Sequence, residues 1–151
     1  MDDVALANYI AGTHSGYVEA GRIDQACGDL LGIEVGTEIW FSDYTLIKLR
    51  GKHGDINFAH YRHMPSIQLS GFLAHGRHSN LAELWWANLS NEERAAFFVV
   101  LKATGKQEVF VSTFHRISFK EARRLWRRAT EDSRLVRTQA GAEEFLKIRR
   151  R

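Results

Sequence analysis

The sequence contains only one cysteine, Cys27, and one proline, Pro65, among its 151 residues. A single cysteine cannot form a disulfide bond within the chain, so a disulfide-stabilised fold is excluded. No segment approaches the roughly 20 consecutive apolar residues that a membrane-spanning helix needs. The first residues, Met1, Asp2 and Asp3, lack the basic and then apolar pattern of a secretory signal peptide. We therefore expect a cytoplasmic protein that does not act at a membrane.

The sequence also lacks internal repeats, low-complexity tracts and the stretches rich in proline or glycine that mark linkers. A chain of 151 residues with 44% hydrophobic residues is long enough to bury one compact core. We expect a single domain over residues 1–151, with the core at about 39–129 and a basic C-terminal extension at 130–151.

Charge is unevenly distributed along the chain. Residues 116–151 contain 12 lysines and arginines against 5 acidic residues, whereas residues 1–115 contain 9 against 13. A basic segment attracts polyanions, of which nucleic acid is the commonest, although a solvated helix face with an arginine tail gives the same pattern. The arginines that we expect to contact nucleic acid are Arg50, Arg62, Arg116, Arg123, Arg124, Arg127 and Arg128.

Hydrophobic periodicity and turn residues predict an α+β fold. N-terminal helices would pack on a small antiparallel sheet of about four strands, and a basic C-terminal helix would follow. Ser118 and Glu121 form a capping box at the start of that helix, which runs to about Ala129, and residues 104–107 predict a β-hairpin. The other helices are predicted at 3–11, 18–31, 42–51, 57–63, 65–70 and 142–148, and the strands at 38–41, 72–75, 81–86, 97–103 and 109–115.

Histidine is the most over-represented residue type, with seven in the chain, six of them from His53 to His115. An imidazole has an unperturbed pKa near 6.5 and can both accept and donate a proton near neutrality. Two pairs share one spacing and could together bind a metal ion such as zinc. However, each pair encloses an arginine, which would repel a cation, and no Cys, Asp or Glu stands at ligand spacing beside either pair. Ordinary packing or surface histidines are therefore the favoured interpretation. The two pairs are His60 with His63 and His75 with His78.

The segment 109–116 predicts a strand, and strict alternation divides its side chains between two faces. The preceding strand is apolar up to Lys102. A sheet surface with Lys102, Thr113 and His115 could bind a phosphate and transfer a proton, although Thr113 alone is also an ordinary strand former. The alternation predicts Val109, Val111, Thr113 and His115 on one face and Phe110, Ser112, Phe114 and Arg116 on the other.

Aromatic side chains offer a further contact with nucleic acid. Tyr61, Trp85 or Trp86 could stack on an RNA base. For the two tryptophans, burial in the hydrophobic core is the favoured interpretation.

Three segments, IWFSDYTLIKLRGKHGDI, HYRHMPSIQLSG and VVLKATGKQEVFVSTFHRIS, resemble the phage-associated members of the barnase, EndoU, colicin-type and RelE-like (BECR) ribonuclease superfamily. The resemblance covers about residues 39–129 and rests on short motifs. It implies an α+β fold with a four-stranded antiparallel meander and a cleft for RNA on one face of the sheet. At matching positions, it implies that the site includes Lys48, His53, Lys102, Ser112 and Thr113.

Together these observations lead us to expect a metal-independent endoribonuclease, in which a 2′-hydroxyl attacks the adjacent phosphorus and forms a cyclic phosphate. The reaction needs a base, an acid and fixed positive charge at the phosphate. We expect no cofactor and no bound metal ion, and we expect RNA, for example transfer RNA, and an inhibitor protein or antitoxin as partners. The proton-transfer pair would be His53 and His115, with Lys48 and Lys102 stabilising charge and Ser112 and Thr113 orienting the phosphate.

Two alternatives remain open at this point. The chain could be a non-catalytic module that uses the basic helix to bind nucleic acid or a phage protein. It could also be a metalloprotein that uses the paired histidines as ligands.

Overall fold

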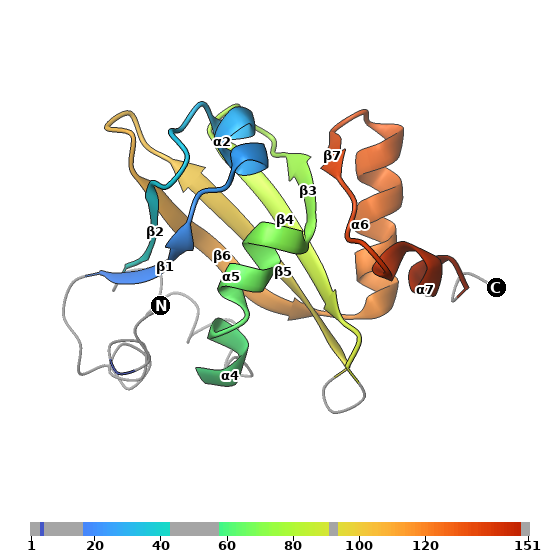
Figure 1. The fold of residues 1–151 in the computed structure, drawn as a ribbon. Helices are drawn as coiled ribbons and strands as arrows, with labels where there is room; N and C mark the ends of the chain where they lie inside the picture. Colours follow the sequence, from blue (N-terminus) through green and yellow to red (C-terminus); the bar gives the residue numbers. More distant parts are fainter. Residues whose placement is uncertain (1–3, 5–16, 43–57, 91–93, 149–151) are drawn as a thin grey trace.

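The computed structural model describes residue 4 and residues 17–42, 58–90 and 94–148 (Figure 1). None of the helices in these ranges is both long and apolar enough to cross a membrane. In chain order the elements are β1 (Val18–Arg22), α2 (Gln25–Leu31), β2 (Glu38–Phe41), α4 (Phe58–Tyr61), α5 (Met64–Ser70), β3 (Phe72–His75), β4 (Leu81–Asn88), β5 (Ala95–Ala103), β6 (Val109–Ile117), α6 (Phe119–Glu131), β7 (Leu135–Arg137) and α7 (Ala142–Ile148).

The strands form one mixed sheet of seven strands in the order β1-β2-β6-β5-β4-β3-β7. Strands β2 and β6 run parallel, and all other neighbours run antiparallel. The predicted antiparallel sheet of about four strands is therefore wrong. Turn signals identify hairpins between strands that are adjacent in the sequence. They do not identify the pairing of β2 with β6, which lie about 70 residues apart, or the two short edge strands.

The predicted arrangement of the helices is also wrong. The segment 18–31, predicted as one helix, forms β1 and then α2. Val18 and Ala20 are buried between more exposed residues, and β1 pairs with β2 on both sides of a bulge at Ala20. The basic helix α6 does not end the fold, since β7 and the short α7 follow it. The helices predicted at 3–11 and 42–51 lie outside the described residues.

Several single elements agree with their predictions. Strands β2 and β3 have the predicted bounds, and β5 and β6 are antiparallel neighbours joined through residues 104–108. Helix α5 has Pro65 in its first turn and ends at Gly71, whose N–H donates to the carbonyl of Ile67 at 2.9 Å. The Ser118 hydroxyl accepts from the N–H of Glu121 at 3.0 Å, so the predicted start of α6 is confirmed.

One face of the sheet, here called the buried face, packs against α2, α4 and α5, which lie in front of the sheet in Figure 1. Its side chains form the larger hydrophobic cluster. Aromatic rings meet at its centre, where Phe114 packs on Phe41, Tyr61 and Phe97 with ring centroids 5.1 to 6.4 Å apart. These four residues are 0 to 2% exposed, so water is excluded from this aromatic cluster.

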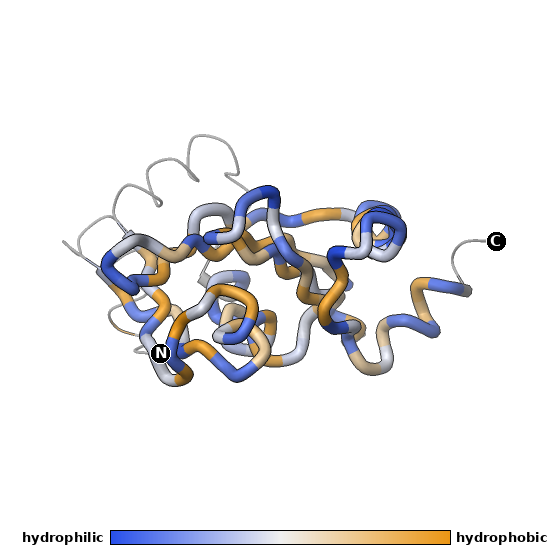
Figure 2. The backbone as a smooth tube through the Cα atoms, turned by 90° about the horizontal axis from the view of Figure 1, so that it is seen from above, coloured by the Kyte–Doolittle hydropathy of each residue, from blue (hydrophilic) through white to orange (hydrophobic). Residues whose placement is uncertain are grey.

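The opposite face, here called the α6 face, packs against α6 and α7 over β4 and part of β5. Figure 2 shows α6 end-on, with hydrophobic and hydrophilic positions on different sides of the helix. Ala122 and Ala129 of α6 are buried, and Phe72 stacks on Trp85 with a centroid separation of 5.3 Å. This second cluster is smaller, and the side chains over β6 and the end of β5 are half-buried or exposed.

Two side chains near the C-terminal end of the fold fasten β7 to the rest of the sheet. Arg137 donates to the carbonyl oxygens of Gly71 and Gln68 at 2.8 and 2.7 Å and to the Asp24 carboxylate at 3.0 Å. The buried amide of Gln139 accepts from the N–H of Ala87 and donates to its carbonyl. Gln139 satisfies the backbone of Ala87, which lies on β4 beyond the last pair with β3, and Arg137 joins β7 to the end of α5 and the start of α2.

Candidate nucleic-acid interface

A β-bulge in β6 decides which of its side chains share a face. Val100 pairs with Thr113, but the next residue of β5, Leu101, pairs with Val111. Ser112 is therefore an extra residue without a partner position on β5.

The bulge changes which β6 side chains lie on each face of the sheet. Phe114 is fully buried beside Val109 and Val111, and these three residues lie on the buried face. Thr113 and His115 share the α6 face with Phe110. Strict alternation, which grouped Thr113 and His115 with the two valines, is therefore wrong, because one extra residue inverts the alternation in the second half of the strand.

Three successive cross-strand pairs form a row on the α6 face. They are Phe98 with His115, Val100 with Thr113, and Lys102 with Phe110. Each step of two residues advances about 6.6 Å, so Lys102 and His115 lie about 13 Å apart along the sheet. The row thus brings His115 and Thr113 together as neighbours and places the exposed Lys102 one step further along.

An aromatic group extends this row toward the sheet edge. Trp40 pairs with Phe110 across β2 and β6, and both rings are half-buried. The ring of Tyr17 lies 5.4 Å from Phe110 and 6.3 Å from Trp40, and 55% of the Tyr17 residue is exposed. The end of the row near Lys102 therefore combines a positive charge with accessible aromatic surface.

Other predicted site residues lie elsewhere. Arg116 is exposed on the buried side of β6, and Arg62 is exposed in the turn between α4 and α5, which cover the same side. The structure does not bring these two arginines to the row that contains His115. Lys48, Arg50 and His53 lie outside the described residues.

The four arginines of α6 do not form one surface. Arg128 lines a groove on the α6 face, whereas Arg123 and Arg127 lie beside Trp126 on the side that faces α7. Arg124 donates to the Glu121 carboxylate at 2.7 and 2.9 Å, and this hydrogen bond and the charge of Glu121 raise the pKa of Arg124. Only Arg128 is therefore positioned to act with the groove described next.

That groove lies between α6 and the sheet and encloses about 450 Å³. Arg134 crosses it and contacts Glu83 at 3.4 Å and Asp132 at 3.5 Å, while also donating to the carbonyl of His75. Within the described part of the chain, Arg77 and Arg128 form no ion pair. The lining residues are Arg77, Glu83, Phe98, Leu125, Arg128, Asp132 and Arg134.

The groove adjoins the row. Its floor includes Phe98, whose ring centroid lies 5.3 Å from that of His115. The groove was not predicted from the sequence. Alternation in β4 and β5 could have placed Glu83 and Phe98 on one face, but no local pattern indicates that Arg77 and Arg134 reach it from two separate turns.

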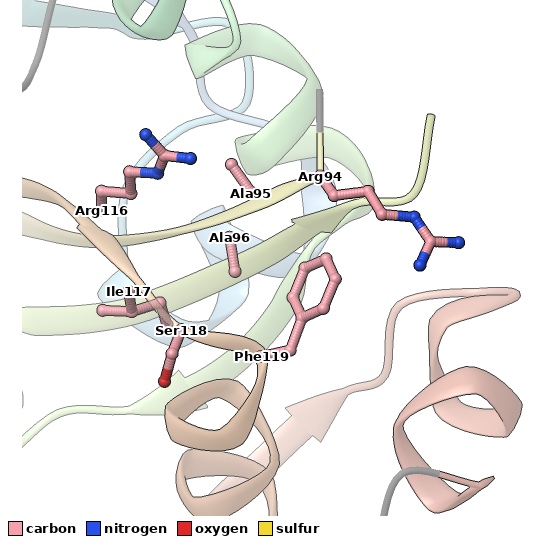
Figure 3. A pocket seen from close by; sticks show the side chains of 7 residues that line it. All are labelled: Arg94, Ala95, Ala96, Arg116, Ile117, Ser118 and Phe119. Carbon is pink, nitrogen blue, oxygen red and sulfur yellow. The ribbon is translucent and has the colours of Figure 1, made fainter. Parts of the chain in front are cut away.

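A second pocket, of about 380 Å³, lies where β6 passes into α6 (Figure 3). Figure 3 shows the guanidinium groups of Arg94 and Arg116 on opposite sides of it. The Ser118 hydroxyl at its border already accepts from the backbone of Glu121. The two cations do not converge on one point, so this pocket is a weaker candidate for an anion than the groove.

The paired histidines do not form a metal site in the part of the chain that the structure describes, which contains no group of three or more candidate metal ligands. His60 is buried, with its ring 5.2 Å from Phe97, and His63 packs between Phe97 and Trp86. His75 and His78 are exposed. The first pair thus packs against the core.

The aromatic residues proposed from the sequence for base stacking are mostly unavailable. Tyr61 is 2% exposed and Trp85 is fully buried, which agrees with the core alternative for that tryptophan. Trp86 is half-buried against His63. Tyr17, Trp40 and Phe110 provide the accessible rings instead.

No family model matches the sequence, and no match was found among curated proteins or solved structures. Functional inference therefore rests on the geometry of the α6 face.

Proposed function

We propose that the chain binds single-stranded RNA across the α6 face and cleaves it without a metal ion. The observation that supports the proposal most strongly is the row of His115, Thr113 and Lys102 on one accessible sheet surface. A histidine, a hydroxyl and a fixed cation are the groups that phosphodiester cleavage through a 2′-hydroxyl requires. The proposed site of action is the cytoplasm.

In this mechanism His115 exchanges a proton with the reacting RNA. The 2′-oxygen forms a bond to phosphorus and loses its proton to a base, while the bond to the 5′-oxygen breaks and that oxygen receives a proton from an acid. His115 fills one of these roles, and the resemblance to the BECR ribonucleases assigns the other to His53. Thr113 donates a hydrogen bond to a phosphate oxygen, and Lys102 stabilises negative charge on the strand.

The aromatic group next to Lys102 supports a single-stranded substrate. Bases of a single strand are unstacked and can lie on exposed rings, which is a sequence-tolerant contact. Tyr17, Trp40 and Phe110 offer such rings beside the cation of Lys102. A double helix keeps its bases stacked internally and would not use this surface.

The test is incubation of the full chain with total RNA in EDTA. We expect cleavage to products with a cyclic phosphate, and we expect His115→Ala to lower the rate by about 10²- to 10⁴-fold. His75→Ala is the matched control, because this exposed histidine lies at the end of β3, away from the row. Intact RNA both in EDTA and with added divalent metal ions would contradict the proposed activity.

A non-catalytic RNA-binding module is the second candidate. One observation favours it: Lys102 and His115 lie about 13 Å apart, which suits successive contacts along a strand better than joint action on one phosphate. This candidate predicts that Lys102→Gln weakens RNA binding and lowers its salt dependence, whereas His115→Ala leaves binding nearly unchanged. Filter binding in parallel with the cleavage assay distinguishes the two functions.

A further inference from the structure

The groove beneath α6 supports a more specific inference, which rests on the proposed RNA function. We propose that this groove binds one nucleotide unit of the RNA beside His115. The base would lie on the apolar floor formed by Phe98 and Leu125, and the phosphate would lie between Arg77 and Arg128.

The distribution of charge in the groove favours an anionic ligand. Three arginines and two carboxylates line it, and Arg134 contacts both carboxylates. The surplus positive charge therefore belongs to Arg77 and Arg128, which form no ion pair among the described residues. Guanidinium groups bind phosphate through paired hydrogen bonds, and such charge-assisted bonds are stronger than neutral ones.

The floor of the groove favours a flat apolar group joined to that anion. Phe98 and Leu125 are half-buried, and both line the groove. An aromatic ring provides a stacking surface for any base. The volume of about 450 Å³ lies within the range of pockets that bind small organic ligands, so the groove has room for a nucleotide.

The groove lies next to His115, the residue proposed to transfer a proton during RNA cleavage. Phe98 is the cross-strand partner of His115, and their rings are in contact. A nucleotide held over Phe98 therefore has its sugar and phosphate within reach of His115. The next units of the strand would continue over Thr113 toward Lys102 and the aromatic group.

The test must distinguish nucleotide binding by Arg128 from a purely structural role of this residue. It lies in the last turn of α6, where a cation interacts favourably with the helix dipole. That role affects the stability of the fold and not the affinity for a nucleotide. Arg124 is the matched control, because it lies on the same helix, is exposed, and pairs with Glu121 away from the groove.

The experiment measures binding of adenosine monophosphate, adenosine and inorganic phosphate to the full chain by NMR titration. We expect the monophosphate to bind more tightly than either fragment. Arg128→Gln and Arg77→Gln should each lower its affinity by about 10- to 100-fold, as expected for loss of a hydrogen bond between charged groups, while adenosine binding is unchanged. Arg124→Gln should leave all three affinities unchanged, and Phe98→Leu should weaken only the two ligands that contain the base.

Equal affinities of the wild type and both arginine variants for the monophosphate would overturn the nucleotide site, and so would inorganic phosphate binding as tightly as the monophosphate. The titration does not depend on turnover, so the two proposals can fail separately. Cleavage of RNA without binding of the monophosphate would leave the ribonuclease function and remove the nucleotide site. Arginine-dependent binding with intact RNA would keep the nucleotide site and remove the cleavage function.

Discussion

The two faces of the sheet differ in how completely they are covered, although the same strands form both. On the buried face, β5 and β6 place Phe97 and Phe114 against three helices and fully exclude water. On the α6 face, the same two strands place Phe98 and Phe110 half in solvent, beside polar side chains. The buried face stabilises the fold, and the α6 face is left available for contacts with another molecule.

This division follows from the length and position of the covering helices. Helix α6 covers β4 and part of β5, and Ile117 is the β6 side chain that belongs to its hydrophobic cluster. His115 and Thr113 lie beyond the part of the sheet on which α6 packs, and such polar side chains can interact with RNA. A rigid, fully packed opposite face can hold such side chains at fixed spacing, because a packed core leaves the strands little freedom to shift.

The sharpest test of the comparison replaces one phenylalanine of β6 on each face. Phe114→Ala removes a ring that is fully buried among three other aromatic rings, and we expect a loss of about 3–5 kcal/mol in the free energy of unfolding. Phe110→Ala removes a half-buried ring, with an expected loss of about 1 kcal/mol, because less area returns to water. Urea unfolding of both variants measures the difference, and equal losses would mean that the two faces are equally packed.

The next test concerns Arg137, which joins β7 to α2 and α5. Arg137→Met removes the cation paired with Asp24 and the side-chain donor to two carbonyl oxygens. We expect a loss of about 2–3 kcal/mol, since the two charged side chains are only 21% and 20% exposed. Arg22→Met is the matched control, because Arg22 forms ion pairs with Glu19 and Glu38 at 59% side-chain exposure. The control should lose about 0–1 kcal/mol. A similar loss in both variants would show that Arg137 contributes no more than a surface ion pair.

Much of the local structure could be predicted from the sequence, because it depends on neighbouring residues. Gly71 and Gly76 bound β3, and the Ser118 side chain caps the start of α6. At Gly71 a β-carbon would lie 2.8 Å from the carbonyl oxygen of Trp85, so this close approach also requires glycine. Local signals of this kind identify where an element begins and ends.

The errors arose where distant segments decide the structure. Ile23, Cys27 and Leu30 have a helical spacing that predicted one helix over 18–31, but pairing with β2 makes the first part of this segment, Val18–Arg22, a strand. The bulge at Ser112 depends on the register between β5 and β6, which alternation in β6 alone does not reveal. Arg77 reaches the groove from a turn that lies about 40 residues before α6. The chemistry of the row could therefore be proposed from residue types, but the groove could not.

The smallest expected effect concerns the one ionisable thiol of the buried face. Burial raises the pKa of Cys27 from 9.0 to about 12, and the Asp24 carboxylate adds to this shift, while Arg137 opposes it. The folded chain therefore keeps a proton that the unfolded chain releases between pH 9 and pH 12. Stability from this group is complete below pH 9 and falls as the pH rises, by at most about 1.4 kcal/mol per pH unit.

Urea unfolding of the wild type and of Cys27→Ala between pH 7 and pH 11 measures this contribution. Other groups titrate in both proteins, so the difference between the two curves isolates the thiol. We expect the wild type to lose stability more steeply than Cys27→Ala above pH 9. Parallel curves would mean that water reaches Cys27, and the buried face would then be less completely closed than its packing indicates. The same titration repeated on Phe114→Ala should end the steep region at a lower pH, because a cavity in that face admits water and lowers the folded-state pKa of the thiol, while the start near pH 9 is set by the unfolded chain.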